Sequence, residues 1–156
     1  MGGIVRAMSD PRDAGRDGRN RWDAIAAGEV RFPVNETLGF ELVPTGDPTE
    51  SVSFTWEVPA QYCNSAGTLQ GGMLAAFADA ALGTVTTPHF SEDHYPALAE
   101  MKISIMRPAL AGDMLTATGR VLKAGRRVLF AEVEVTDSSG KLIAKVSGTE
   151  VPAQHP

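Results

Sequence analysis

The chain of 156 residues contains one cysteine, Cys63, and lacks features that would place it in several protein classes. A single cysteine excludes an internal disulfide and fits a reducing, cytoplasmic setting. The first twenty residues are rich in Arg, Asp and Gly and lack the apolar stretch of a secretory signal. We therefore expect a cytoplasmic protein in which residues 1–20 form a mobile leader.

Basic charge and long apolar runs are also scarce. The 14 Lys and Arg residues against 19 Asp and Glu residues give a net charge of -5, so nucleic acid is not an expected partner. The longest apolar segment contains a charge and several glycines and has too few large residues to span a membrane. A hydrophobic fraction of 43% with 21% charged residues is ordinary for a globular protein. We expect one domain over residues 21–156, large enough for its own core.

Hydrophobic periodicity divides this domain into two helical and several extended segments. A short helix is expected at residues 21–28, where Gly28 would end it. Residues 32–42 are expected to form a connecting segment that ends in an apolar stretch, which could be a short strand. Residues 51–58 alternate cleanly and predict a half-buried strand. A long apolar helix is expected from residue 70 or 71 to about residue 87, with Thr68 as the better candidate for its cap.

The second half of the chain predicts four strands, at residues 98–107, 114–122, 128–136 and 142–151, with a hairpin turn at 137–140. Short connections favour antiparallel pairing. A helix that is apolar on all sides must be enclosed, and a curved antiparallel sheet wrapped around it would enclose it. The sequence therefore predicts an α+β fold whose outer sheet face carries Lys102, Glu132, Glu134 and Lys145.

Asp79 is the only ionisable residue between Gly71 and Gly83. Its neighbours three and four positions away on a helix are Ala and Leu or Gly, so we expect it to be buried and its pKa to be raised. A carboxylate in such a setting is a candidate for acid–base or nucleophilic catalysis. The alternative is an Asp at a helix edge that is hydrogen-bonded to a neighbouring loop.

The segment NSAGTLQGG, residues 64–72, leads into this helix. Helix N-termini carry unpaired N–H groups that suit an oxyanion, and Gly71 and Gly72 would let a ligand approach the backbone. The alternative is that the two glycines only let the helix pack closely on the sheet. Gly71 and Asp79 are eight residues apart, which corresponds to a rise of about 12 Å along one helix. A single carbonyl cannot touch both groups, so two groups acting on one substrate would come from two subunits.

The same segment, with Asp79 nine residues after Gln70, resembles the signature of hotdog-fold acyl-CoA thioesterases of the phenylacetyl-CoA thioesterase type. The resemblance extends through residues 38–41, 105–109, 112–113 and 148–149 and covers roughly residues 38–152. It implies the hotdog fold, a sheet around a central helix. It also implies homodimers that often pair into tetramers, and acyl-CoA as the substrate.

By this resemblance, Asp79 is the general base or nucleophile, the Gly71 N–H polarises the thioester carbonyl, and Asn64 orients the water or the carbonyl. Gln70 stands where the family usually has His and can hydrogen-bond without titrating near neutral pH. Many relatives also have Ser or Thr at the start of the strand after the helix, where this chain has residues 97–99, ALA. The resemblance implies no metal and no cofactor other than the coenzyme A that is part of the substrate. The residues suggest no metal either, because His89, His94 and His155 lack a ligand partner at fixed spacing.

Several other residues are candidates for substrate binding or catalysis, and each also has a purely structural interpretation. Gly72 belongs to the glycine pair, and Arg107, Arg126 and Arg127 are candidates for the CoA phosphates, although Arg126 and Arg127 also suit a hairpin turn. Cys63 could be a nucleophile or simply a buried residue. The methionines could line an acyl pocket or fill the core.

Three functions remain open at this point. The first is thioester hydrolysis, and the second is acyl-CoA binding without turnover, favoured by Gln70 and the missing hydroxyl. The third, a hydratase or dehydratase, needs a His paired with an acid, and neither the long helix nor its leading loop contains a His.

Overall fold

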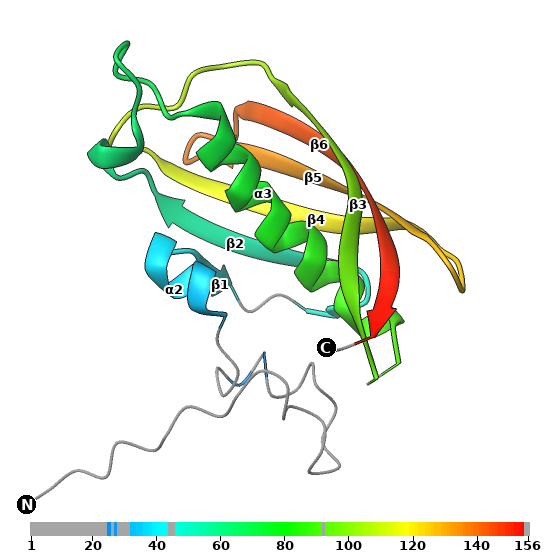
Figure 1. The fold of residues 1–156 in the computed structure, drawn as a ribbon. Coiled ribbons are helices and arrows are strands. Elements are labelled where there is room, and N and C mark those ends of the chain that lie inside the picture. Colours follow the sequence, from blue (N-terminus) through cyan, green and yellow to red (C-terminus); the bar gives the residue numbers. More distant parts are fainter. Residues whose placement is uncertain (1–24, 26, 28–31, 44–45, 92, 155–156) are drawn as a thin grey trace, which may run out of the picture.

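The computed structural model describes residues 25, 27, 32–43, 46–91 and 93–154 (Figure 1). The predicted leader at 1–20 lies outside the described residues. Of the helix predicted at 21–28, only Ile25 and Ala27 are described. Ile25 is helical and buried.

The described residues form a six-stranded sheet in which every strand pair is antiparallel. The strands are β1 (Glu41–Val43), β2 (Ser51–Glu57), β3 (His94–Ile105), β4 (Met114–Ala124), β5 (Leu129–Asp137) and β6 (Leu142–Gln154). Their order across the sheet is β1-β2-β4-β5-β6-β3, so β3 pairs with β6 rather than with the next strand in sequence. Antiparallel pairing and the four strands after the long helix confirm the prediction.

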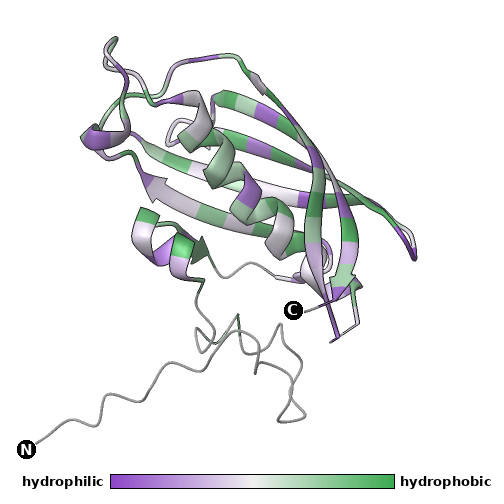
Figure 2. Cartoon of the chain, in the orientation of Figure 1, coloured by the Kyte–Doolittle hydropathy of each residue, from purple (hydrophilic) through white to green (hydrophobic). Residues whose placement is uncertain are grey.

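Two α-helices and two short 3-10 helices complete the described fold: α2 (Pro33–Leu38), α3 (Gly71–Thr86), η2 (Ala60–Tyr62) and η3 (Thr87–His89). Figure 1 shows α3 lying along one face of the sheet, which curves around it. In Figure 2, α3 is mostly pale or green, while the strands alternate between green and purple bands. The α+β arrangement predicted from the sequence, a curved sheet around a long apolar helix, is confirmed.

An aromatic cluster holds α3 against the start of the sheet. The ring of Trp56 lies 5.0 Å from that of Phe40 and 5.3 Å from that of Phe77 in α3, measured between centroids. The Trp56 indole N–H donates a 2.8 Å hydrogen bond to the Leu38 carbonyl at the end of α2. The cluster therefore ties α2, β2 and α3 into one core.

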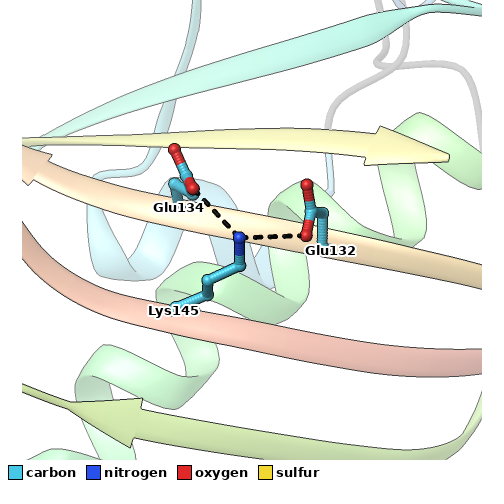
Figure 3. A network of polar contacts seen from close by, with 3 residues as sticks. All are labelled: Glu132, Glu134 and Lys145. Atoms are coloured by element: carbon cyan, nitrogen blue, oxygen red, sulfur yellow. Dashed lines mark hydrogen bonds and ion pairs between the residues drawn. The ribbon is translucent and has the colours of Figure 1, made fainter. Parts of the chain in front are cut away.

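The outer face of the sheet is polar, as predicted. The Lys145 ammonium lies 3.2 Å from a carboxylate oxygen of Glu132 and 3.1 Å from one of Glu134 (Figure 3). Both acids lie on β5 and the lysine on β6. Because these side chains are accessible to solvent, the network contributes little to stability.

Two local predictions at the ends of elements were wrong. Residues 33–38, read as a connecting segment, form α2, because Pro33 begins a helix that ends at Gly39, whose positive φ of 79° caps it. The cap of α3 is Gln70, in an extended conformation and without a side-chain cap hydrogen bond. Thr68 instead takes part in the loop before it, where it forms an isolated β-bridge with Leu110.

Candidate functional site

The start of α3 presents backbone donors without a side-chain cap. The Gln70 carbonyl accepts from the N–H groups of Met73 and Leu74, at 2.9 and 3.2 Å. The N–H groups of Gly71 and Gly72, the first two helical residues, have no partner within the helix, and the Gln70 side chain caps neither of them. The N–H of Gly71 is therefore placed where an oxyanion would be stabilised.

A pocket of about 370 Å³ opens beside Gly71. Its walls come from the loop before α3, the first turn of α3 and the segment that follows β3. They comprise Thr68, Leu69, Gly71, Leu74, Ile105, Met106, Arg107, Pro108 and Ala109. Most of these residues are apolar, and Ile105 and Met106 are 48% and 51% exposed. The pocket can therefore accept an apolar group next to the helix start.

The two glycines at the helix start differ in their surroundings. A Cβ on Gly71 would lie 3.2 Å from the Ile105 Cδ1 atom, whereas a Cβ on Gly72 would have no atom of the chain within 4 Å. Close packing within the chain therefore accounts for Gly71 in part but not for Gly72. The space above Gly72 is open to a ligand or a second subunit.

Asn64 braces the loop that leads into α3. Its carboxamide oxygen accepts from the backbone N–H of Ala66 at 2.9 Å and of Thr68 at 3.3 Å, and its carboxamide nitrogen donates to the Thr68 hydroxyl at 3.0 Å. Its backbone carbonyl accepts from Gly67, whose φ is 77°. Asn64 is exposed, but its side chain is occupied by its own loop.

Asp79 lies on the open side of α3. The sequence predicted a buried carboxylate, and in the single chain this is wrong, because Asp79 is exposed. The sheet covers only the face of α3 that carries Leu74, Phe77, Ala78 and Ala81, so α3 is not enclosed. Partial burial still raises the pKa of Asp79 above its ordinary value, as predicted.

Sequence reasoning missed a second carboxylate, Glu150 on β6. Its side chain is 1% exposed, and neither carboxylate oxygen has a hydrogen-bond partner. Burial, with a smaller contribution from the negative charge of Asp79, raises the pKa of Glu150 to about 7. The sequence did contain a signal for this burial. Side chains on a strand alternate between its two faces, so Glu150 lies on the same face as Ala144, Val146 and Gly148, which face the core.

The candidate arginines lie at opposite ends of the sheet. Arg107 lines the pocket beside Gly71, and its guanidinium donates to the Leu142 carbonyl. Arg126 and Arg127 lie in the turn between β4 and β5, where the adjacent ladder pairs Ala124 with Leu129. Within one chain, only Arg107 is close to the helix start.

The remaining candidates lie at the edge of the core. Cys63 is half-buried, and its thiol lies 3.9 Å from the Pro59 carbonyl oxygen. Met73 and Met101 pack against the core, whereas Met106 lines the pocket. Among the described residues, no group of three or more His, Cys, Asp or Glu side chains could hold a metal ion. No helix within the described part of the chain is long and apolar enough to cross a membrane.

The sequence that forms the loop, the helix start and most of the sheet matches a known family. Residues 66–144, from the loop before α3 into β6, match the family model described as the thioesterase superfamily. The chain belongs to the thioesterase superfamily. Its fold is the hotdog fold that the resemblance implied.

This thioesterase-superfamily chain is 33% identical to mouse acyl-coenzyme A thioesterase 13 over 90 residues, which cover 57% of the chain and 64% of the mouse protein. The matched part thus spans less than two thirds of that relative. A phenylacetic acid degradation-related protein from Ralstonia eutropha superposes with a TM-score of 0.77 at 27% identity, covering 85% of this chain and 99% of that one. A Streptococcus mutans protein bound to acetyl CoA superposes with a TM-score of 0.68 at 25% identity, covering 81% and 94%.

Proposed function

We propose that this protein hydrolyses acyl-CoA thioesters to a free acid and CoA, at a site that two subunits complete. The observation that carries the proposal is the position of Gly71 and Asp79 on one helix, with a pocket beside Gly71. Membership of the thioesterase superfamily and the names of the relatives supply the reaction type. The acetyl CoA in the Streptococcus mutans structure supports CoA as the carrier.

The two groups have complementary chemical roles. Asp79 removes a proton from water as it attacks the thioester carbonyl, or attacks that carbonyl itself and forms an anhydride that water then cleaves. The Gly71 N–H stabilises the oxygen that becomes negative. In both routes the tetrahedral intermediate collapses with cleavage of the C–S bond, and CoA leaves as the thiolate and takes up a proton. In the second route this cleavage yields the anhydride, before water attacks it. The resemblance assigns orientation of the water or carbonyl to Asn64, which would require its side chain to turn from its own loop.

The separation along α3 requires a second subunit. Eight residues of helix give a rise of about 12 Å, and one carbonyl cannot lie within hydrogen-bond reach of both ends. A partner chain packed on the open face of α3 would bring its own Asp79 to the Gly71 of this chain. It would also cover Gly72 and the exposed Asp79. We therefore propose a homodimer and, following the resemblance, its pairing into a tetramer in the cytoplasm.

The pocket and its arginine indicate how substrate would bind. The apolar walls accept the acyl group, and Arg107 at the pocket contacts a CoA phosphate. Arg126 and Arg127 could reach the same CoA only from the partner subunit, because they lie at the other end of the sheet. Gly72 lets the ligand pass close to the backbone. The name of the Ralstonia eutropha neighbour places phenylacetyl-CoA among the first substrates to test.

Subunit mixing tests the site directly. CoA release should be measured on short, medium and aryl acyl-CoAs for wild type, Asp79→Asn, Gly71→Val and a refolded mixture of the two variants. Each variant alone should be inactive, and the mixture should recover roughly a quarter of wild-type activity. This is expected because half of the dimers are mixed and each mixed dimer has one intact site. Wild-type turnover by Asp79→Asn would show that the assigned role is wrong, and an inactive mixture of folded dimers would place both groups in one chain.

A second candidate function, acyl-CoA binding without turnover, is favoured by Gln70 in place of the family's usual His. The same substrate panel separates the two functions. Saturable binding of acyl-CoA without CoA release at any acyl length would select the binding protein.

A further inference from the structure

Glu150 is a buried acid without a partner. Both oxygens of its carboxyl group are inaccessible to solvent and have no hydrogen-bond partner, and its side chain is 1% exposed. A charged carboxylate in this position would lack both water and a counter-charge, which is costly. A neutral carboxylic acid costs much less. An apolar side chain would fill this core position without that cost, so packing alone does not explain a carboxyl group at residue 150.

The position of Glu150 places it on the face of the sheet that supports α3. Gly148, two residues earlier on the same face of β6, lies so close to Leu82 of α3 that an added Cβ would be 2.7 Å from the Leu82 Cδ1 atom. Asp79 precedes Leu82 by three residues and projects from the neighbouring side of the helix. The charge of Asp79 is close enough to act on the Glu150 carboxyl group.

Within the described part of the chain, the other elements packed around Glu150 supply no titratable partner on this face. Antiparallel partners share a face of the sheet, and Glu150 pairs with Leu98 on β3 and Leu129 on β5. Its neighbours on β6 are Gly148 and Pro152. The next titratable side chain on this face of β3 is His94, two pairs away, whose Nδ1 atom lies 2.9 Å from the Ser91 hydroxyl oxygen. Among the described residues, Asp79 is the acid that Glu150 faces.

We propose that Glu150 is the second carboxylate of the site and that it acts in its neutral form on Asp79. This inference rests on the proposed hydrolysis, because Asp79 is the base or nucleophile of that reaction. While Glu150 keeps its proton, the pair carries one negative charge, at Asp79. When Glu150 loses the proton, a second negative charge lies near Asp79, in the site where the oxyanion develops, and opposes the transition state. Glu150 touches no substrate atom, so it is a positioning residue that acts through its charge.

The loss of the Glu150 proton as the pH rises predicts how kcat/KM depends on pH. Glu150 loses its proton at about pH 7 in the folded chain, because burial and the charge of Asp79 raise its pKa. Wild-type kcat/KM should therefore fall on the alkaline side, by at least about tenfold between about pH 6 and about pH 9. Glu150→Gln keeps the shape of the side chain but cannot ionise. It should retain most of its pH 6 activity at pH 9.

The closing experiment measures this profile in wild type, Glu150→Gln and the control Glu57→Gln. Glu57 is exposed at the end of β2, so its variant should keep the wild-type alkaline fall. A Glu150→Gln profile that superposes on wild type would overturn the proposal. A purely structural role for Glu150 would change stability without removing the alkaline fall.

A second measurement keeps the inference testable if no acyl-CoA is hydrolysed. The carboxyl carbon of Glu150, assigned by comparison of labelled wild type and Glu150→Gln, is followed by NMR from pH 4 to about pH 9. A titration near pH 7 in the absence of CoA release would leave the protonation of Glu150 supported and reject the hydrolase. A titration at the ordinary value of 4.5 would reject the neutral acid whatever the activity.

Discussion

Gly119 of β4 lies directly against Ala81 of α3. A Cβ added at Gly119 would come within 2.9 Å of the Ala81 carbonyl oxygen and 3.2 Å of the Val85 Cγ1 atom. A backbone carbonyl in the middle of a helix cannot move without shifting the helix. This contact therefore sets how closely α3, and with it Asp79 and the helix start, approaches the sheet.

Gly119→Ala should destabilise the fold. The added methyl group must push α3 away from β4, which typically costs about 1–3 kcal/mol. The matched control is Gly46→Ala, whose Cβ meets open space in an exposed loop away from the site and which should be neutral or gain up to about 1 kcal/mol of stability. Urea unfolding of the two variants checks the prediction. Equal stability of the two variants would show that α3 does not contact β4 as described.

Asp79→Asn should remove turnover and leave the fold intact. The carboxylate supplies general base or nucleophilic catalysis, and its loss should lower kcat by at least about 100-fold. Because Asp79 is exposed in the single chain, the neutral amide should not lower the midpoint of thermal unfolding. CoA release and a thermal scan measure the two effects. The assignment does not survive if the variant loses activity only in proportion to folded protein.

The main elements of the fold could be predicted from hydrophobic periodicity. The alternation of Val52, Phe54 and Trp56 and the apolar run of α3 predict elements that the structure contains with boundaries shifted by a few residues. The pairing of β3 with β6 is long-range and leaves no local pattern. The six-residue helix α2 was missed because so short a segment has too few turns to show a period.

The site was predictable only in part. Gly71 and Arg107 line one pocket, because Arg107 follows a strand that ends beside the helix start, and Gln70 is the N-cap that directly precedes Gly71. The exposure of Asp79 was missed because a helix that looks apolar on all sides does not reveal which face its own sheet covers. Glu150 was missed because the boundaries of a strand do not reveal which of its residues face the core.

Gln70→Glu should separate helix stability from activity. A carboxylate at the N-cap interacts favourably with the helix dipole, by about 0.3–1 kcal/mol. The same charge would compete with the oxyanion for the Gly71 N–H, so kcat should fall by about tenfold or more. Thermal unfolding and CoA release are measured on one preparation. Unchanged turnover together with higher stability would indicate that the helix start does not contact the reacting carbonyl.

Arg107→Gln should weaken acyl-CoA binding. Loss of a charge-assisted contact to phosphate removes about 1.5–3 kcal/mol, which raises KM by roughly tenfold or more while kcat changes little. The matched control is Arg120→Gln, since Arg120 is exposed on β4 and pairs with Glu132 on the outer part of the sheet. Steady-state kinetics at two salt concentrations check the expectation. The same KM in both variants would leave phosphate recognition to Arg126 and Arg127 of a partner subunit.

Activity should also fall at acid pH, because Asp79 must be ionised to act. Partial burial raises its pKa above the ordinary value of 3.8, so protonation should remove activity at a pH above that value. A partner subunit on the open face of α3 would bury the carboxylate further and move the loss toward neutral pH. The kcat/KM is measured from about pH 4 to about pH 7 in wild type and in Glu150→Gln, whose acid limb should remain because the Asp79 charge is unchanged. A rate that stays constant down to pH 4 would mean that the group which must be ionised is not a carboxylate with a raised pKa, and Asp79 could then not be the base.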